Sequence, residues 1–347
     1  MIDFSDIFAK KTDFNIKYSL ERISKVFKIL GSPSSSTPSI IVGGTNGKGS
    51  VCAFLSAFFE SIGLKVGLYT SPHLIHFSER IYVSGEHIDD EYLRSEVDEL
   101  FNTVGTDLIN YLSFFEITTL VAFRIFDKHK TQINVLEVGM GGRLDAVNII
   151  NPYISVIVTI ADDHKQYLGN TIQKIAYEKA GIMRNQQPVF LGMSYKQQQY
   201  AEALTIILDL ASQINAKVYL MDINYGLCEN DIFYINLDSQ IIYYKLPIYL
   251  KERASFLQRN YCLAAAVFAY YCTRFLCYNI SNIEQYFQNI TNQYTKFSVI
   301  KGRDQIVQVN INNTFNHVFL FDVCHNIEGV LSFKEALFNR YCNQLPL

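Results

Sequence analysis

Short apolar segments alternate with helical patterns from residue 39 to about residue 220, and this alternation constrains the fold more than any other feature. The apolar segments are rich in β-branched residues and too uniformly apolar to leave one face in water, which is typical of strands buried on both sides. The alternation therefore predicts an α/β fold with a mostly parallel sheet flanked by helices. The expected strands are SIIVG (39–43), KVGLYT (65–70), INVLEVG (133–139), YISVIVTI (153–160), PVFLG (188–192) and AKVYLM (216–221).

The rhythm changes after residue 222. Residues 223–250 have the pattern of hairpins, and helical patterns follow over 256–277 and 281–293. After about residue 295 the sequence predicts two strands, joined through Asn312 and Asn313, and then one helix. We therefore expect a first domain over 1–295 and the start of a second α/β domain over 296–347, because about fifty residues are too few to fold independently. The chain is expected to end inside this second domain.

Charge and composition exclude several classes of protein. The 30 basic and 33 acidic residues give a net charge of −3, and no basic run is present, which argues against a nucleic-acid-binding surface. The first thirty residues carry charges throughout and lack the apolar core of a secretory signal, so a cytoplasmic location is expected. The apolar stretch 261–280 is interrupted by Arg274 after thirteen residues, short of the ~20 that a membrane span needs, and is interpreted as a buried helix.

A glycine-rich turn lies between the first expected strand and the helix that follows it, in the sequence IIVGGTNGKGSV (40–51). Such a turn presents unpaired backbone N–H groups at a helix N-terminus and favours anion binding. Lys48 adds a charge for terminal phosphates, and Ser50 adds a hydroxyl. The match to the common P-loop pattern is imperfect, because Val42 stands at its first glycine and Gly49 at its Ser or Thr, so a simple tight turn is the alternative.

Further polar residues follow neighbouring expected strands. Glu137 ends the strand INVL, and His164 follows the strand YISVIVTI, so both are expected at the carboxyl edge of the sheet beside the glycine turn. With the hydroxyl of Ser71 they offer ligands for a hard cation. Taken singly, Glu137 could instead pair with Arg143, and His164 could be an ordinary hydrogen-bonded residue.

Five motifs in order make the sequence recognisable. They are GTNGKGS (44–50), TSPHLIHFSERI (70–81), SFFEITTLVAF (113–123), EVGMGGRLDAVN (137–148) and DHKQYLGNTIQKIAYEKAGI (163–182). Together they resemble the Mur ligase superfamily, and within it the folylpolyglutamate synthase and dihydrofolate synthase branch. The resemblance covers about residues 15–330 and implies a Mur-ligase-like P-loop domain, followed by a second α/β domain that is incomplete here.

The resemblance also implies an activity. The family joins the amino group of L-glutamate to a carboxylate of dihydropteroate or folate, with ATP and through an acyl phosphate. The implied small molecules are therefore ATP, L-glutamate and dihydropteroate or folate, with two magnesium ions and with carbon dioxide as the source of a lysine carbamate. No nucleic acid or membrane partner is implied, and a monomer is expected.

The resemblance assigns roles to residues at the matching positions. The residues expected to carry the chemistry are Lys48, Glu137, His164 and Lys179, and the expected metal ligands are Ser71, Glu137, His164 and carbamylated Lys179. A carbamate presents the anionic oxygens that magnesium prefers, whereas an ammonium cannot bind the ion. Because carbamylation needs the neutral amine, Lys179 is expected where desolvation or nearby cations lower its pKa. The alternative is a surface lysine beside Glu178.

The remaining roles concern ATP and the pterin substrate. The expected ATP-binding residues are Thr45, Asn46, Gly47, Lys48, Gly49, Ser50, Asn260, Arg303, Asp322 and His325. The expected substrate-binding residues are Ser113, Phe114, Phe115, Glu116, Leu144, Asp145 and Ala146. Aromatic faces suit a flat pterin or benzoyl ring, although Phe114 and Phe115 could equally belong to the core. Closure of the C-terminal segment over the first domain is expected to complete the ATP site.

The shortened second domain keeps other interpretations open. Relatives continue well beyond the motif FDVCHN (321–326), so the chain is either an active ligase of folate metabolism or a catalytically weak or silent nucleotide- or folate-binding paralogue. Another ligase of the Mur superfamily, such as one acting on cell-wall precursors, is a further possibility. A simple P-loop kinase would leave the motifs EKAGI and GGRLDA unexplained.

Overall fold

The chain folds around one large twisted sheet, seen in a computed structural model that describes residues 19–228, 231–237, 240–251, 253–293, 302–311 and 315–341. Eleven strands follow the order β11-β10-β9-β8-β7-β6-β1-β5-β2-β3-β4. The strands are β1 (Ser39–Gly43), β2 (Val66–Tyr69), β3 (Ile81–Val83), β4 (Glu86–His87), β5 (Ile133–Glu137), β6 (Ile154–Ile157), β7 (Pro188–Ser194), β8 (Lys217–Met221), β9 (Tyr225–Leu227), β10 (Ile232–Leu237) and β11 (Gln240–Lys245).

The centre of the sheet is parallel, as predicted. Strand β1 lies between β5 and β6 and pairs in parallel with both, and β2 and β7 continue the parallel part on either side. The strands β9, β10 and β11 pair antiparallel, which agrees with the hairpin pattern expected over 223–250. At the other edge, β3 and β4 add antiparallel strands that the sequence pattern does not predict.

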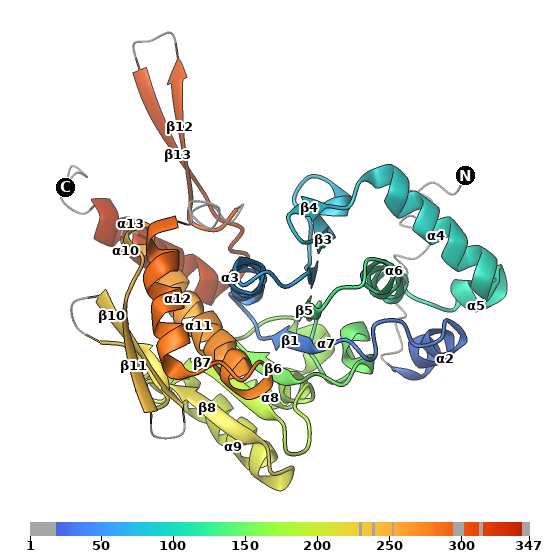
Figure 1. The fold of residues 1–347 in the computed structure, drawn as a ribbon, viewed down its shortest axis with the longest axis horizontal. Coiled ribbons are helices and arrows are strands. Elements are labelled where there is room, and N and C mark those ends of the chain that lie inside the picture. Colours follow the sequence, from blue (N-terminus) through green and yellow to red (C-terminus); the bar gives the residue numbers. More distant parts are fainter. Residues whose placement is uncertain are drawn as a thin grey trace.

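Both faces of the sheet are covered by helices (Figure 1). Neighbouring residues of β1 alternate between the two cores: Ile41 belongs to one hydrophobic cluster, and Ile40 and Val42 belong to the other. The helices on the Ile41 side are α2 (Glu21–Ile29), α4 (Asp90–Val104), α5 (Thr106–Asn110), α6 (Phe114–Lys128), α8 (Ile172–Ala180) and α9 (Ala201–Gln213). Those on the other side are α3 (Lys48–Ser61), α11 (Ser255–Phe275) and α12 (Ile280–Gln293).

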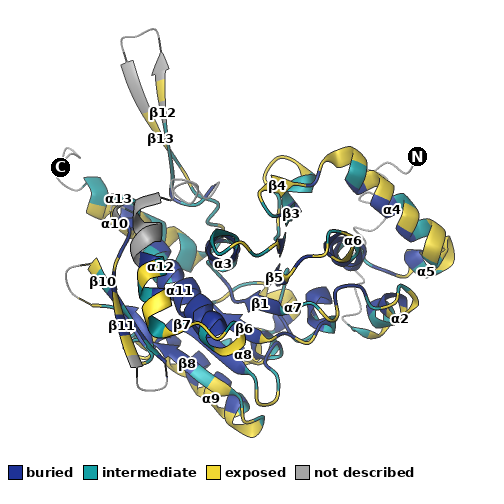
Figure 2. Cartoon of the chain, in the orientation of Figure 1, coloured by how far each residue is buried: buried dark blue, intermediate teal, exposed yellow. Residues whose placement is uncertain are grey.

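Helix α11 contains most of the apolar stretch that could be mistaken for a membrane span. It packs beside α3, and most of its side chains are buried in the core, as the dark blue ribbon in Figure 2 shows. Among the described residues, no helix is long and apolar enough to cross a membrane. The interpretation of 261–280 as part of a buried helix is consistent with this packing.

The C-terminal segment forms a separate small unit. Strands β12 (Gln305–Ile311) and β13 (Phe315–Phe321) pair with each other in a two-stranded sheet, project from the body (Figure 1), and lead to α13 (Ile327–Tyr341). This agrees with the two strands and one helix that the sequence predicts, whereas the expected turn at Asn312 and Asn313 lies outside the described residues. The expected domain boundary at 295 lies outside them as well and stays a proposal.

The unit is anchored to the body by Asp304, which is fully buried. Its carboxylate accepts hydrogen bonds from the guanidinium of Arg340, at 2.9 and 2.7 Å, and from the backbone N–H of Ala254, at 3.1 Å. The guanidinium of Arg253 forms a further ion pair with it at 3.8 Å. One buried carboxylate therefore joins the start of β12, the end of α13 and the entry to α11.

Candidate active site

The glycine turn leads from β1 directly into α3, as predicted. Gly47 is the residue before the helix and has a φ of +86°, a left-handed conformation that favours glycine. The turn is held from the side by Thr159, because the backbone N–H of Thr45 donates to its carbonyl at 2.7 Å and that of Asn46 to its hydroxyl at 3.0 Å. The hydroxyl of Ser50 is buried and has no hydrogen-bond partner among the described residues. This loop therefore presents an unsatisfied polar atom at a helix N-terminus, where an anion or its counter-ion is favoured.

Two lysines, one from the start of α3 and one from α8, donate to the loop. The ammonium of Lys48 donates to the carbonyls of Gly44 and Thr45, at 3.1 and 3.0 Å, and that of Lys179 donates to the same Gly44 carbonyl at 2.8 Å. Lys179 is only 2% exposed, which is inconsistent with a surface lysine beside Glu178. Burial, together with the charge of Lys48, lowers the pKa of Lys179 to about 7. This agrees with the expectation that the amine lies where its neutral form is accessible.

Glu137 ends β5 with its carboxylate buried beside the same loop. It accepts a hydrogen bond from the backbone N–H of Ser71 at 2.9 Å, and its oxygens lie close to Gly49, within 3.7 Å of where a side-chain carbon would begin. Burial raises the pKa of Glu137, while the charge of Lys48 opposes the shift. The alternative pairing of Glu137 with Arg143 is wrong, since Arg143 pairs with Glu178 at 2.8 Å.

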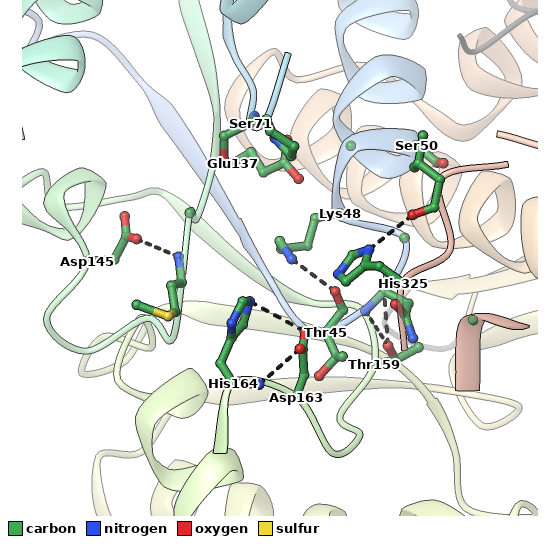
Figure 3. Close-up of a pocket in the computed structure, with 18 of the residues that line it drawn as sticks. Thr45, Lys48, Ser50, Ser71, Glu137, Asp145, Thr159, Asp163, His164 and His325 are labelled. Atoms are coloured by element: carbon green, nitrogen blue, oxygen red, sulfur yellow. Dashed lines mark hydrogen bonds and ion pairs between the residues drawn. The ribbon is translucent and has the colours of Figure 1, made fainter. Parts of the chain in front are cut away.

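His164 reaches the site from the loop after β6. Its backbone is left-handed, with a φ of +48°, and its ring lies beside Asp163, with Nε2 3.6 Å from a carboxylate oxygen (Figure 3). Partial burial lowers the pKa of His164, and the charges of Lys179 and Lys48 act in the same direction, against Asp163. The neutral imidazole, which is the form that can bind a cation, is therefore favoured.

The chemistry of the side chains around the loop suits a divalent cation, although they are not gathered into a preformed binding site. Across the described part of the chain, no three His, Cys, Asp or Glu side chains gather in a metal-binding arrangement. The donor set here is one buried carboxylate, one imidazole and one hydroxyl, from Glu137, His164 and Ser71, beside the orphaned hydroxyl of Ser50. Few protein oxygens and an adjoining phosphate site suit magnesium, which keeps several ligands from water and phosphate.

The expected pterin side of the site comes from the start of α6 and the loop after β5. The ring of Phe115 packs over Gly139 and borders the cavity, whereas Phe114 packs against Phe77, with ring centroids 5.6 Å apart. Ser113 and Glu116 form a capping box at the start of α6, so part of their hydrogen bonding is structural. One carboxylate oxygen of Glu116 accepts hydrogen bonds both from the backbone N–H of Ser113, at 2.6 Å, and from the guanidinium of Arg22, at 3.4 Å.

Asp145 combines a structural and an electrostatic role. Its carboxylate accepts hydrogen bonds from the backbone N–H groups of Met140, at 3.0 Å, and Val147, at 3.1 Å. Burial raises the pKa of Asp145 to about 6, although these hydrogen bonds oppose the shift. It therefore shapes the loop that carries Leu144 and Ala146 and also borders the cavity.

The C-terminal segment closes the cavity from the opposite side. The carboxylate of Asp322 accepts from the backbone N–H groups of Asp304 and Cys324, both at 2.9 Å, and so holds the loop that carries His325. Burial lowers the pKa of Arg303, against the charges of Glu137 and Asp322. Asn260, from α11, lies directly behind Gly47, with its side-chain nitrogen 2.7 Å from where a side-chain carbon would begin.

A single cavity of about 570 Å³ unites these groups, a volume typical of small-molecule sites. Two of the predicted residues, Phe114 and Lys179, do not line it, and Lys179 lies beneath the loop instead. The predicted residues that line it are Thr45, Asn46, Gly47, Lys48, Gly49, Ser50, Ser71, Ser113, Phe115, Glu116, Glu137, Leu144, Asp145, Ala146, His164, Asn260, Arg303, Asp322 and His325.

Several lining residues are missing from the sequence-based set. Arg80 is 9% exposed, donates to the ring nitrogen Nδ1 of His73 at 2.8 Å, and lies in the motif TSPHLIHFSERI, so the motif could have indicated it. Thr159 lies next to the end of the strand expected over 153–160 and could have been found as a residue at the carboxyl edge of the sheet. Tyr200 and Glu328 have no local signal, because their contact joins residues 128 positions apart.

Comparison with known proteins identifies the family of this fold and site. The model of the Mur ligase middle domain matches residues 42–205. A dihydrofolate synthase/folylpolyglutamate synthase of Buchnera aphidicola is 31% identical over 336 residues, which cover 95% of this chain and 72% of the relative. The proteins of the same name from Haemophilus influenzae and Escherichia coli are 36% and 29% identical, over 64% and 90% of this chain. The chain spans 49% and 66% of the length of these two relatives.

Solved structures agree with these relatives. A bifunctional folylpolyglutamate synthase/dihydrofolate synthase of Yersinia pestis, complexed with AMPPNP and a manganese ion, matches 97% of this chain and 75% of its own, with 26% identity and a TM-score of 0.78. A complex of a folylpolyglutamate synthase with AMPPCP and folate matches 100% of this chain and 82% of its own, with 25% identity and a TM-score of 0.79. With the glycine loop, Glu137 and Lys179 placed as described, the chain belongs to the dihydrofolate synthase/folylpolyglutamate synthase family of Mur ligases.

Proposed function

We propose that the chain is an ATP-dependent ligase that adds L-glutamate to dihydropteroate or to a folate, through an acyl phosphate. The observation that carries this proposal is the convergence, in one cavity, of an anion-binding helix N-terminus, the buried carboxylate of Glu137 and the ammonium of Lys48. The related structures with AMPPNP, manganese, L-glutamate or folate support the choice of substrates. We also propose that the protein is a monomer, that it acts in the cytoplasm, and that its first domain ends near residue 295.

The nucleotide phosphates are expected on the loop between β1 and α3. The backbone N–H groups at the start of α3 face them, and the ammonium of Lys48 moves from the carbonyls of Gly44 and Thr45 to the outermost phosphate. Arg303 and His325 approach from the C-terminal segment and exclude water from the same space. These groups place positive charge where the transferred phosphoryl group gains negative charge.

The proposed reaction has two steps. The substrate carboxylate attacks the γ-phosphorus of ATP, so that the bond to the bridging oxygen of ADP breaks and an acyl phosphate forms. The amine of glutamate then attacks the acyl carbon, loses a proton, and displaces inorganic phosphate as the amide forms. Because neither step needs a covalent bond to the protein, the residues of the chain act by positioning and charge neutralisation.

The divalent ion is expected on Ser71, Glu137 and His164, where it would neutralise phosphate charge. Glu137 is suited to this task because its carboxylate is buried and fixed by the backbone N–H of Ser71. His164 contributes a neutral imidazole from the opposite loop. In this proposal Lys179 completes the set as a carbamate, formed when its neutral amine attacks carbon dioxide and loses a proton, and its lowered pKa supports that step.

The pterin substrate is expected between Phe115 and the loop of Leu144, Asp145 and Ala146. The face of Phe115 suits a flat ring, and the carboxylate of Asp145 can accept hydrogen bonds from N–H groups on the ring edge. Arg80, buried next to this side of the cavity, adds a cation that the sequence-based set lacks.

Phosphate release tests the proposal. With ATP, magnesium and L-glutamate, phosphate should appear only when dihydropteroate or tetrahydrofolate is added, and Glu137→Gln should lower the rate by at least a hundredfold, because it removes the buried negative charge. The matched control is Glu91→Gln, an exposed carboxylate on α4, which should keep the rate. Phosphate release that does not depend on the pterin, or an unchanged rate in Glu137→Gln, would refute the ligase. ATP binding without turnover would instead support the nucleotide-binding paralogue.

A further inference from the structure

Three segments that are distant in the sequence are joined by hydrogen bonds through Glu328, and one of them is the phosphate loop with Asn46. The amide of Asn46 donates to the side-chain oxygen of Asn326, at 3.1 Å, and to the carboxylate of Glu328, at 2.7 Å. Its own oxygen accepts from the amide of Asn326 at 2.9 Å. The other carboxylate oxygen of Glu328 accepts from the hydroxyl of Tyr200, also at 2.7 Å. Glu328 therefore bridges the phosphate loop and the start of α9.

Each member of this group is fixed by its own element. Tyr200 is 5% exposed and ends the short 3-10 turn before α9. Asn326 holds the start of α13, because its side chain accepts from the backbone N–H of Gly329 at 2.9 Å. The backbone N–H of Asn46 is held by Thr159. A displacement of α13 would therefore act on the loop through these hydrogen bonds.

Both polar atoms of the Asn46 side chain thus form hydrogen bonds with side chains of the protein itself. The phosphates would be bound by the backbone N–H groups of the loop and by Lys48, while the amide of Asn46 contacts the C-terminal segment. The same cavity is bordered by Asn46, Tyr200, Glu328 and Gly329. Opening of α13 would therefore remove three hydrogen bonds from the loop and one wall from the nucleotide site.

We propose that Tyr200 and Glu328 are positioning residues, which act through Asn46 to hold the phosphate loop in its nucleotide-binding form only while α13 is closed over it. The identity of the nucleotide as ATP rests on the proposed function. The coupling itself rests on the contacts of Asn46, Tyr200, Asn326 and Glu328, which we call the Asn46 cluster. It predicts that a substitution on α13 changes amide exchange in the loop, and that a substitution of Tyr200 changes amide exchange at the start of α13.

The test compares Tyr200→Phe, Glu328→Gln and the double variant with the unaltered chain. Hydrogen exchange of backbone amides is measured over residues 44–50 and 322–332 without nucleotide, and affinity for magnesium AMPPNP is measured by calorimetry. Each single variant should speed exchange in both segments and weaken nucleotide binding about tenfold, as expected for one hydrogen bond to a charged group. The double variant should be no weaker than the more affected single variant, because both remove the same bridge.

The matched control is Glu335→Gln, an exposed carboxylate on the same helix, which should change neither exchange nor affinity. Faster exchange confined to the altered segment, additive effects in the double variant, or an equal effect of Glu335→Gln would overturn the proposal. Failure of the unaltered chain to bind the nucleotide would count against the proposed function, whereas the exchange measurement would still decide the coupling.

Discussion

The buried ammonium of Lys179 should make the stability of the fold depend on pH in a way that one substitution removes. In water a lysine side chain has a pKa near 10.5, and burial lowers it to about 7 here. Between these values the unfolded chain binds the proton and the folded chain does not, so the free energy of unfolding rises with pH. The cost of burying the amine is therefore complete below about pH 7 and absent above about pH 10.5.

The magnitude follows from the size of the pKa shift. A difference of about 3.5 pH units at about 1.4 kcal/mol each corresponds to about 5 kcal/mol. Lys179→Met keeps the volume of the side chain and removes the amine. It also leaves the carbonyl of Gly44 with one donor fewer, which costs about 1 kcal/mol at every pH. The net effect at pH 7 is stabilisation of the variant by a few kcal/mol.

The assay is urea unfolding of both proteins from pH 7 to pH 10, in buffer free of metal ions and of carbon dioxide. The stability of the unaltered chain relative to Lys179→Met should rise by about 1.4 kcal/mol per pH unit over this range. Lys174→Met, which removes an exposed ammonium from the same helix, is the control and should give a flat difference. A flat difference for Lys179→Met as well, or one that falls with pH, would refute the argument from burial.

Two further predictions concern the loop and the anchor of the C-terminal segment. Gly47→Ala and Gly63→Ala both place a side chain at a φ near +85°, which should lower the free energy of unfolding by about 1 kcal/mol in each case. Only at position 47 would the new carbon also contact Asn260, at 2.7 Å. Calorimetry with an ATP analogue should therefore show that Gly47→Ala binds it at least tenfold more weakly and that Gly63→Ala keeps the affinity of the unaltered chain. Equal affinities of the two variants would contradict the close contact. Asp304→Asn removes the charge of a fully buried carboxylate that binds the half-buried guanidinium of Arg340, and the weaker hydrogen bonds should cost about 1.5–3 kcal/mol, seen as faster proteolysis of the C-terminal segment. Proteolysis at the unaltered rate would show that the ion pair does not hold the segment.

Local patterns in the sequence predict the central strands well, because runs of β-branched residues bounded by Gly or Pro have few other structures available. The strand predicted over 39–43 is found as β1 without a shift. The strand predicted over 153–160 ends at Ile157, since Thr159 directs its carbonyl and hydroxyl to the phosphate loop instead of the sheet. The strand β3 is only three residues long, too short for a period of two to be visible.

Site residues can be predicted from the sequence where the residue type and its position in a motif together indicate a chemical role. A lysine in a phosphate loop and a carboxylate at a strand end can be placed from sequence alone, and the motifs assigned roles to many others. The contact of Tyr200 with Glu328 could not be predicted, because it depends on how the C-terminal segment packs on α9. The partner of Arg143 likewise depends on the packing of α8, which brings Glu178 rather than Glu137 to it.

The carbonyl oxygen of Gly44 accepts from two ammonium groups at once, those of Lys48 and Lys179. Each cation therefore raises the electrostatic cost of the other, and conversion of Lys179 to an anion would turn mutual repulsion into attraction across the same atom. In this structure Lys48 is therefore held between an attractive carbonyl oxygen and the repulsive charge of Lys179. Carbamylation of Lys179, which lies beneath the loop, would then set how freely Lys48 leaves the Gly44 carbonyl for a nucleotide.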